Sequence, residues 1–112
     1  MKVASKKSVF GDFTEMVNLE YFSESKIIKV IKKEVIETTE KNFLLVFLEE
    51  YVEDKNSKEL LKLKDIKIWG SAWIWDKLEE GKIYEIKWNG KKNDKKTKRK
   101  INSFDLVEVI VD

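Results

Sequence analysis

Residues 69–90 restrict the possible folds of this chain more than any other stretch. The segment opens with a Trp-Gly pair, after which the hydroxyl of Ser71 is placed to accept a free backbone N–H as a helix N-cap. It continues to Gly81, where the left-handed conformation that ends many helices costs least. Between these two residues, Ile74 and Leu78 share one face of a helix. We therefore expect a short helix bounded by Ser71 and Gly81.

The residues after this helix change to a two-residue period. Tyr84, Ile86 and Trp88 alternate with charged or polar neighbours, which is the pattern of a strand with one buried face. We expect the Trp88 ring to lie in the core. A strand, a short helix and a strand, in a chain that otherwise reads mostly as strands, predict a small closed barrel with the helix at one end.

Four further strands are expected on the same grounds. They cover residues 26–38, 42–52, 60–69 and 101–111, where β-branched or alternating apolar residues recur. In the first, third and last of these the parity of the apolar positions changes along the strand, which is the sequence trace of a bulge. With the strand at residues 82–89, the prediction is an all-β chain of five strands.

Residues 1–25 fit neither the helical nor the strand period for long, and we interpret them as an N-terminal arm. The arm is rich in large apolar side chains, namely Phe10, Phe13, Met16, Val17, Leu19, Tyr21 and Phe22. A disordered tail would carry fewer of them. We therefore expect the arm to pack on its own barrel, which spans residues 26–112, or alternatively on a second copy of the chain or another protein partner.

The absence of cysteine and histidine excludes several kinds of site. It removes disulfides, thiolate nucleophiles, the two commonest zinc ligands and the histidine base of serine and cysteine triads. The adjacent carboxylates Glu49-Glu50 and Glu79-Glu80 would point to opposite faces of a strand and would not act as an acid–base pair. We expect a protein that is not an enzyme and holds no metal or cofactor.

A membrane partner is not expected either. No run of apolar residues approaches the length of a membrane span. The N-terminus lacks the basic, then apolar, then small-residue order of a signal peptide. The expected location is the cytoplasm.

Charge is distributed unevenly along the chain. The net charge is only +2, but residues 90–100 carry seven basic residues and one aspartate, a local charge of +6, which leaves about −4 for the rest. Arg99, the only arginine, lies in this basic run. Such a run is often just a solvated loop, but the segregation also gives it a strongly positive field that suits phosphate groups. We expect a basic loop between the fourth and fifth strands.

The order of these elements resembles that of OB-fold single-stranded DNA-binding proteins. The resemblance rests on residues of the third strand, the helix and the fourth strand: Ile68, Trp69, Gly70, Leu78, Gly81, Tyr84 and Ile86. It implies a five-stranded OB-fold Greek-key barrel, with a short helix between strands 3 and 4 and an N-terminal extension. It also implies a binding channel across the second and third strands, flanked by the loops after the first and fourth strands.

In such a channel, single-stranded DNA would be held by stacking of bases on aromatic rings. Trp69 is the first stacking candidate, because Lys67 on the same side of its strand indicates an exposed face. Lys67 is itself expected to be a nucleic-acid-binding residue. Trp73 and Trp75 are about 200° apart around a helix, so one of them is expected to be exposed, and the sequence leaves open which.

Two aromatic residues of the second strand and the basic run complete the predicted site. Phe47 and Tyr51 lie opposite the aliphatic face of their strand and are expected to join Trp69, although burial under the arm explains them equally well. Phosphate contacts are assigned to Lys91, Lys92, Lys95, Lys96, Lys98, Arg99 and Lys100. The function predicted from these residues is single-stranded DNA binding with little sequence specificity.

Two alternatives stay open at this point. An RNA-binding OB domain would use the same surface, since nothing in the sequence identifies a group that reads a 2′-hydroxyl. A non-catalytic protein-interaction subunit of a DNA replication or repair complex would instead use the exposed aromatic residues as interface anchors and the arm as a docking element.

Overall fold

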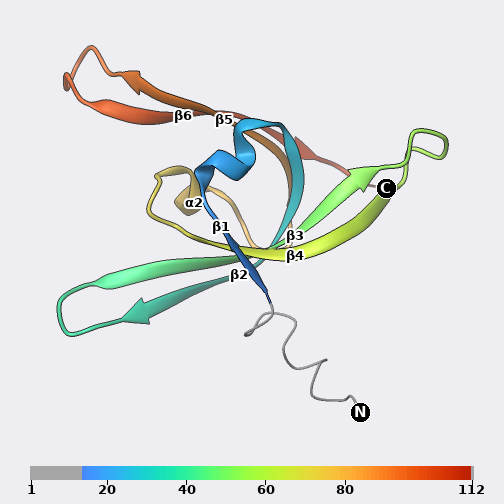
Figure 1. Ribbon diagram of the computed structural model, residues 1–112, viewed down its shortest axis with the longest axis horizontal. Helices are drawn as coiled ribbons and strands as arrows, with labels where there is room; N and C mark the ends of the chain where they lie inside the picture. The colour runs from blue at the N-terminus through green and yellow to red at the C-terminus, as the bar shows by residue number, and fades with distance from the viewer. Residues whose placement is uncertain (1–13, 112) are drawn as a thin grey trace.

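The structure, a computed structural model, describes residues 14–111; residues 1–13 and 112 are not described. The described part is mostly β-structure, which confirms the expected all-β class (Figure 1). In chain order its elements are β1 (Glu15–Val17), the 3-10 helix η2 (Leu19–Ser23), β2 (Lys26–Glu37), β3 (Asn42–Glu53), β4 (Leu60–Trp69), α2 (Ile74–Lys77), β5 (Ile83–Asn93) and β6 (Lys100–Val109).

The strands form one curled, six-stranded sheet in the order β1-β4-β3-β2-β5-β6. Strand β2 lies near its centre and pairs with β3 along its length and with β5 over its first four residues. Strand β1 pairs in parallel with β4, with Glu15 opposite Ile66. The expected count of five strands is therefore wrong by one, because a strand of three residues is too short to show a period of two. Phe10 and Phe13, which were expected to pack as part of the N-terminal arm, lie outside the described residues.

Two predicted bulges are confirmed. The register of β2 on β3 shifts between Val30 and Lys32. The register of β3 on β4 shifts after Glu50, and Leu63 of β4 has no opposing residue in β3. A bulge increases the local twist of a strand, so these two positions help the long strands to curl around a single core.

The third irregularity lies earlier than the sequence indicates. The change of parity between Phe104 and Val107 predicts a bulge in the second half of β6, but the β5–β6 register shifts between Trp88 and Lys91. Gly90 lies in this shift with φ of 81°, a left-handed conformation that favours glycine. Strand β5 then continues to Asn93, so part of the expected loop is a hairpin of paired strands.

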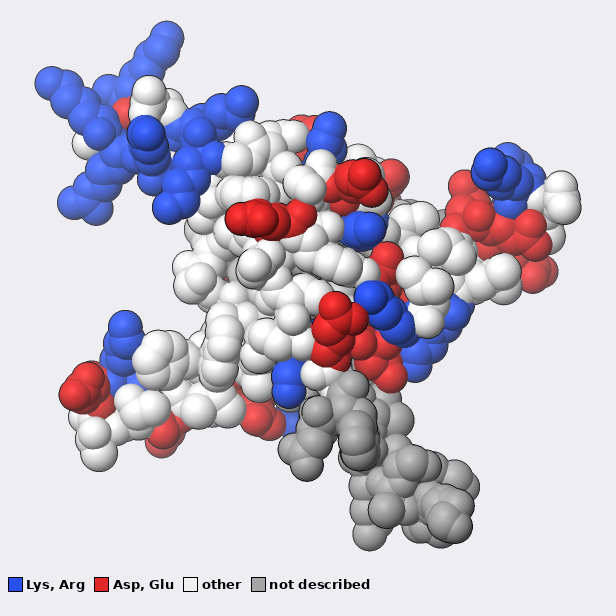
Figure 2. Space-filling view, viewed as in Figure 1, with Lys and Arg blue, Asp and Glu red and all other residues white. Residues whose placement is uncertain are grey.

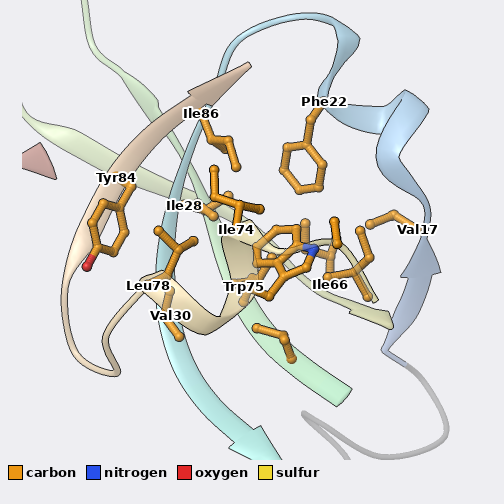
Figure 3. Packing of buried hydrophobic residues seen from close by; sticks show 14 residues of the cluster. Val17, Phe22, Ile28, Val30, Ile66, Ile74, Trp75, Leu78, Tyr84 and Ile86 are labelled. Carbon is orange, nitrogen blue, oxygen red and sulfur yellow. The ribbon is translucent and has the colours of Figure 1, made fainter. Parts of the chain in front are cut away.

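The core fills the inside of the curl and includes residues from both helices (Figure 3). Trp75 of α2 and Phe22 of η2 are fully buried, and their ring centroids are 5.8 Å apart. Strand β4 contributes Ile66 and Ile68, which alternate with outward-facing residues. The buried faces of the two helices thus meet inside the curled sheet.

Helix α2 is shorter than predicted, and Ser71 does not cap it. The helix begins at Ile74, and its N-cap residue is Trp73, which makes no side-chain capping bond. The indole Nε1 of Trp73 instead donates to the backbone oxygen of Asn102 in β6, at 2.8 Å. The residue that precedes the helix is therefore held by a contact with a distant strand. Gly81 does have the expected left-handed conformation, with φ of 88°.

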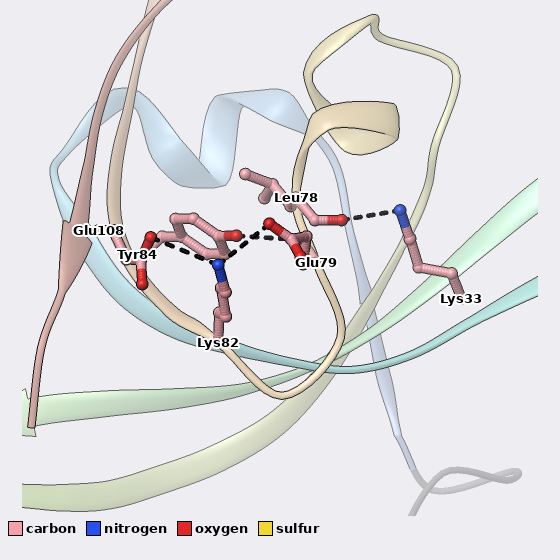
Figure 4. A network of polar contacts seen from close by, with 6 residues as sticks. All are labelled: Lys33, Leu78, Glu79, Lys82, Tyr84 and Glu108. Atoms are coloured by element: carbon pink, nitrogen blue, oxygen red, sulfur yellow. Dashed lines mark hydrogen bonds and ion pairs between the residues drawn. The ribbon is translucent and has the colours of Figure 1, made fainter.

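Two lysines hold α2 and the loop that follows it (Figure 4). Lys33 Nζ donates to the carbonyl oxygen of Leu78, at 2.7 Å, just after the last turn of the helix. A cation at this end also complements the helix dipole. Lys82 Nζ pairs with carboxylate oxygens of Glu79, at 3.1 Å, and Glu108, at 3.8 Å. These contacts connect the helical segment to β2 and β6.

A buried carboxylate connects η2 to the sheet. Glu50 is 3% exposed and accepts a hydrogen bond from the Tyr21 hydroxyl. The ammonium groups of Lys26 and Lys64 lie 4.7 and 5.2 Å from the centroid of the Tyr21 ring. Burial and then the hydrogen bond to Glu50 raise the pKa of Tyr21. The hydroxyl therefore remains a donor to this carboxylate well above neutral pH.

Tyr21→Phe is expected to lower the free energy of unfolding by about 1–3 kcal/mol, because the Glu50 carboxylate stays buried and loses its donor. Urea denaturation at neutral pH measures this difference. The double variant with Glu50→Leu should recover part of the loss, since neither polar partner then remains. An unchanged midpoint for Tyr21→Phe would contradict a stabilising role for the bond.

Candidate nucleic-acid interface

Three large aromatic side chains are exposed near the C-terminal end of β4. They are Phe43 on β3, Trp69 at the last position of β4 and Trp73 just before α2, with 39%, 45% and 48% of their surfaces exposed. Trp69 points outward because Ile66 and Ile68 use the inward positions of the same strand. The structure thus places Trp69 on the surface, and it resolves the choice between the two helix tryptophans in favour of Trp73.

The exposed rings make edge contacts with their neighbours. The centroids of Phe43 and Trp69 are 6.0 Å apart with ring planes at 63°, and those of Trp73 and Phe104 are 5.8 Å apart at 76°. A T-shaped contact occupies at most one face of each ring. The tryptophans are therefore supported by neighbouring rings and still present aromatic surface to solvent.

Two grooves meet at Trp69. One has a volume of about 320 Å³ and is lined by Phe43, Gly70 and Lys41, among others. The second has a volume of about 420 Å³, and Trp69 lines it together with Lys91. A Cβ atom on Gly70 would come within 2.8 Å of the Leu44 side chain, so glycine allows the chain to pass close to β3 at this point.

Asn102 of β6 connects two of the tryptophans and was not predicted from the sequence. Its backbone oxygen accepts the bond from Trp73 Nε1, and its Oδ1 accepts from Trp88 Nε1 at 3.1 Å. Trp88 is half-buried and packs against the core, rather than being a fully buried core residue. Asparagine is uncommon inside strands. Its position within a predicted strand was therefore the sequence signal that could have pointed to Asn102.

The basic run forms the end of the β5–β6 hairpin. Figure 2 shows a dense group of blue side chains at the end of this hairpin, well separated from the rest of the molecule. Its exposed basic residues are Lys91 and Lys92 on β5, Lys95, Lys96, Lys98 and Arg99 in the turn, and Lys100 at the start of β6. The structure thus brings all seven predicted phosphate-binding residues together.

The single acidic residue of the run shapes the turn. Asp94 accepts hydrogen bonds from the Thr97 hydroxyl at 2.9 Å and from the Lys96 backbone N–H at 3.2 Å. These bonds lower the pKa of Asp94. Lys98 has φ of 59° and its N–H donates to the Asp94 backbone oxygen at 2.8 Å. The lysines are therefore carried on a turn with its own hydrogen bonds.

The β3–β4 hairpin has the same turn with different charges. Asp54 accepts from the Ser57 hydroxyl at 3.1 Å and from the Asn56 N–H at 3.0 Å, and Lys58 has φ of 64°. The turn sequence here is Asp-Lys-Asn-Ser-Lys-Glu, with no net charge, against Asp-Lys-Lys-Thr-Lys-Arg, with +3, in the β5–β6 hairpin. The same turn conformation thus occurs in both hairpins, and only the β5–β6 turn is strongly basic.

The β2–β3 and β5–β6 hairpins project on the same side of the molecule (Figure 1). Between them the surface in Figure 2 is mostly uncharged. The β2–β3 turn is held by Thr38, whose Oγ1 accepts from the Lys41 backbone N–H at 3.1 Å. A mostly uncharged surface with exposed aromatic rings therefore lies between two projecting hairpins, and the β5–β6 hairpin carries most of the local positive charge.

Four predicted site residues do not lie on this surface. Two of them, Trp75 and Phe47, are buried. Trp75 is fully buried, because the face it shares with Ile74 packs into the core. Phe47 is 5% exposed, with Lys32 Nζ 5.7 Å from its ring centroid. Neither ring is available for stacking, so these two expectations are corrected.

Tyr51 and Lys67 lie in other surroundings. Tyr51 follows the shift in β3–β4 register opposite the bulge at Leu63, and it lines a separate groove near Leu60. Its hydroxyl donates to Glu49 at 2.6 Å, and burial together with this bond raises the pKa of Tyr51 to about 12. Lys67 is half-buried and lies opposite both Phe47 and Met16 in the sheet. Neither residue lines the grooves at Trp69.

Among residues 14–111, no group of three or more acidic, histidine or cysteine side chains is placed to hold a metal ion. Within the same range, no helix is both long enough and apolar enough to cross a bilayer.

No protein-family model, curated protein or solved structure matches this chain. A function must therefore be inferred from the chemistry of the surface itself.

Proposed function

We propose that the protein has an OB-fold and binds single-stranded DNA with little sequence preference. The order β2, β3, β4, α2, β5, β6 supports this fold, because OB barrels have five strands in Greek-key order. Their oligonucleotides lie on the second and third strands, between the loops after the first and fourth strands. The corresponding parts of this chain are β3, β4 and the β2–β3 and β5–β6 turns, which surround the aromatic surface.

The observation that carries the proposal is a groove whose walls include both Trp69 and Lys91. A ligand in this groove would touch an exposed aromatic ring and the base of the lysine-rich hairpin at once. Single-stranded nucleic acids combine unpaired bases with a phosphate chain, and proteins hold them with aromatic rings and cations. In a duplex the base faces are stacked on each other, so Trp69 would have no partner there.

Trp69→Ala is expected to weaken binding of an oligothymidylate by about 1–3 kcal/mol, the contribution of one stacked base. Stability should change little, since the Trp69 side chain is largely outside the core. Fluorescence anisotropy of a labelled oligonucleotide measures the affinity, and thermal unfolding checks the fold.

Leu61→Ala is the matched control for this prediction. Leu61 also lies on β4 and is 48% exposed, but it lines neither groove at Trp69. Its removal should leave affinity unchanged. Equal affinities for wild type and Trp69→Ala would remove stacking at this position from the proposal. Binding of duplex as tight as that of the single strand would contradict the proposal as a whole, and an RNA of the same sequence tests the RNA alternative.

A protein-binding role is the second candidate, favoured by apolar side chains outside the grooves at Trp69. Val107, near the end of β6, and Ile110, just after it, are 61% and 76% exposed, and Leu63 of β4 is 54% exposed. Sedimentation over a range of concentrations tests whether these residues join two copies of the chain. For residues 1–13, the expectation that the arm docks on a partner lies outside the described residues.

A further inference from the structure

The second half of β6 is exposed on both of its faces. Residues 105–108 are all exposed, whereas the paired part of β5 alternates buried Tyr84 and Ile86 with exposed Glu85 between them. Val107 lies opposite Glu85, on the outward face of the sheet, and is 61% exposed. The outward face of a sheet is usually polar, so an apolar side chain occupies a position where the neighbouring strand has a charged one.

The outer edge of this half-strand is open as well. Within residues 14–111, β6 lies at the end of the sheet and pairs with β5 alone. Trp73 covers part of the first half of β6 through its bond to the Asn102 carbonyl. Residues 106–111 read Leu-Val-Glu-Val-Ile-Val, with one charge and neither glycine nor proline. Segments of this composition on a sheet edge pair readily with another strand.

The open part of the β4 edge is protected in a way that β6 is not. Strand β1 pairs with β4 only from Ile66 onward, so the earlier residues of β4 also lie at the edge of the described sheet. They include Lys62 and Lys64, which form ion pairs at 2.9 Å with Asp65 and Glu15. Charged side chains, and lysines above all, hinder pairing with a further strand. The second half of β6 contains no lysine.

A groove of about 650 Å³ lies beside the end of β6. Its apolar lining includes Val109, Ile110 and Val111, together with Ile83 of β5. Ile110 and Val111 are 76% and 59% exposed. The charged residues of the lining are two of each sign, namely Lys29, Lys58, Glu53 and Glu59. The groove thus combines an apolar strand end with charges that cancel.

We propose that the second half of β6 joins two copies of this chain, with their β6 edges side by side. A two-fold axis perpendicular to the sheet makes two identical edge strands antiparallel, so they can form a regular ladder. The same axis brings the charged residues around the groove toward those of the other copy. A surface with charges of both signs can pair with itself, whereas a surface of one sign repels its copy. These charges therefore favour a second copy over a strongly acidic or basic partner.

The dimer would leave the basic turn of each copy exposed. The turn precedes β6, whereas the proposed contact lies at the other end of the strand, which runs toward the β3–β4 hairpin (Figure 1). Self-association through β6 therefore leaves the surface at Trp69 open and does not depend on DNA binding.

Sedimentation equilibrium of the full chain tests the dimer. At concentrations up to about 100 μM, which detect a dissociation constant in the micromolar range, wild type is expected to approach twice the chain mass of 13.3 kDa. Val107→Asp adds a charge to each of the paired edges and should raise the dissociation constant by about tenfold or more. Circular dichroism should show an unchanged fold, because this side chain lies outside the core.

Val35→Asp is the matched control. Val35 is also an exposed strand valine, at 58%, but it lies on the β2–β3 hairpin. The variant should remain a dimer. Because the chain contains no cysteine, single introduced cysteines locate the contact independently. A short bis-maleimide should link two copies of Val107→Cys and leave Val35→Cys unlinked.

Three results would overturn the inference. One is a wild-type mass of a single chain at every concentration, which would leave single-stranded DNA binding intact if the monomer still binds an oligothymidylate. The second is a dimer that Val107→Asp does not weaken. The third is linking of Val35→Cys as efficient as that of Val107→Cys, which would place the contact elsewhere.

Discussion

Replacing Trp75 with alanine is expected to lower the free energy of unfolding by about 3–5 kcal/mol. The indole is fully buried and its ring packs 5.8 Å from that of Phe22, between α2 and η2. Removing it leaves a cavity between two short helical segments that have little stability of their own. Since small domains are stable by only about 5–15 kcal/mol, the variant should melt at a much lower temperature. Thermal unfolding followed by circular dichroism measures the loss.

Trp75→Phe separates the packing of the ring from its polar group. The Nε1 of Trp75 is buried and has no hydrogen-bond partner in the part of the chain that the structure describes. Phenylalanine fills part of the same volume and removes this unsatisfied donor, whose burial costs about 1–3 kcal/mol. The loss should therefore be clearly smaller than for alanine. Wild-type stability of Trp75→Ala would show that the ring is not a core residue.

Patterns along single strands predicted much of this structure. The bulge at Leu63 and the outward position of Trp69 both follow from the parity of apolar residues in β4. The helix between β4 and β5 was expected from the spacing of Ile74 and Leu78 on one helix face, before Gly81. Each of these features depends on which face of one element is buried, and that is encoded in neighbouring residues.

Features that depend on distant residues were not predictable in the same way. Trp73 donates a hydrogen bond to Asn102, which lies 29 residues later in the sequence, and neighbouring residues give no sign of this contact. Phe47 illustrates a related limit. Alternation assigned it to the outward face of β3, as with Phe43, but alternation does not show which outward side chains are covered.

The sequence placed the basic residues correctly but not the structure that carries them. Lysines at 91–100 were expected on a loop, whereas β5 extends to Asn93 and Asp94 closes a hydrogen-bonded turn. Lysine occurs in loops and on exposed strand positions alike, so a run of lysines does not show which of the two structures it forms. The repeat of the turn at Asp54 was present in the sequence, as Asp-Lys-x-Ser/Thr-Lys, but its meaning required the backbone geometry.

Exchanging the turn at residues 94–99 for the sequence of residues 54–59 is expected to reduce the salt dependence of DNA binding. The substitutions are Lys96→Asn, Thr97→Ser and Arg99→Glu. Two cations are lost, so the slope of log K against log salt should become shallower by about 1.4, from about 0.7 for each phosphate contact. Affinity at low salt should also fall. Stability should be retained, because both sequences form the same hydrogen bonds. Anisotropy titrations at several salt concentrations measure the slope.

The reciprocal exchange separates the position of the charge from its amount. When Asn56→Lys, Ser57→Thr and Glu59→Arg are added, the protein regains its wild-type composition and its net charge of +2. The basic turn then lies on the β3–β4 hairpin, which projects from the other side of the molecule (Figure 1). If phosphates are contacted beside Trp69, this doubly exchanged protein should bind as weakly as the single exchange. Recovery of wild-type affinity and slope would mean that net charge alone attracts DNA, and that the β5–β6 hairpin is not part of the site.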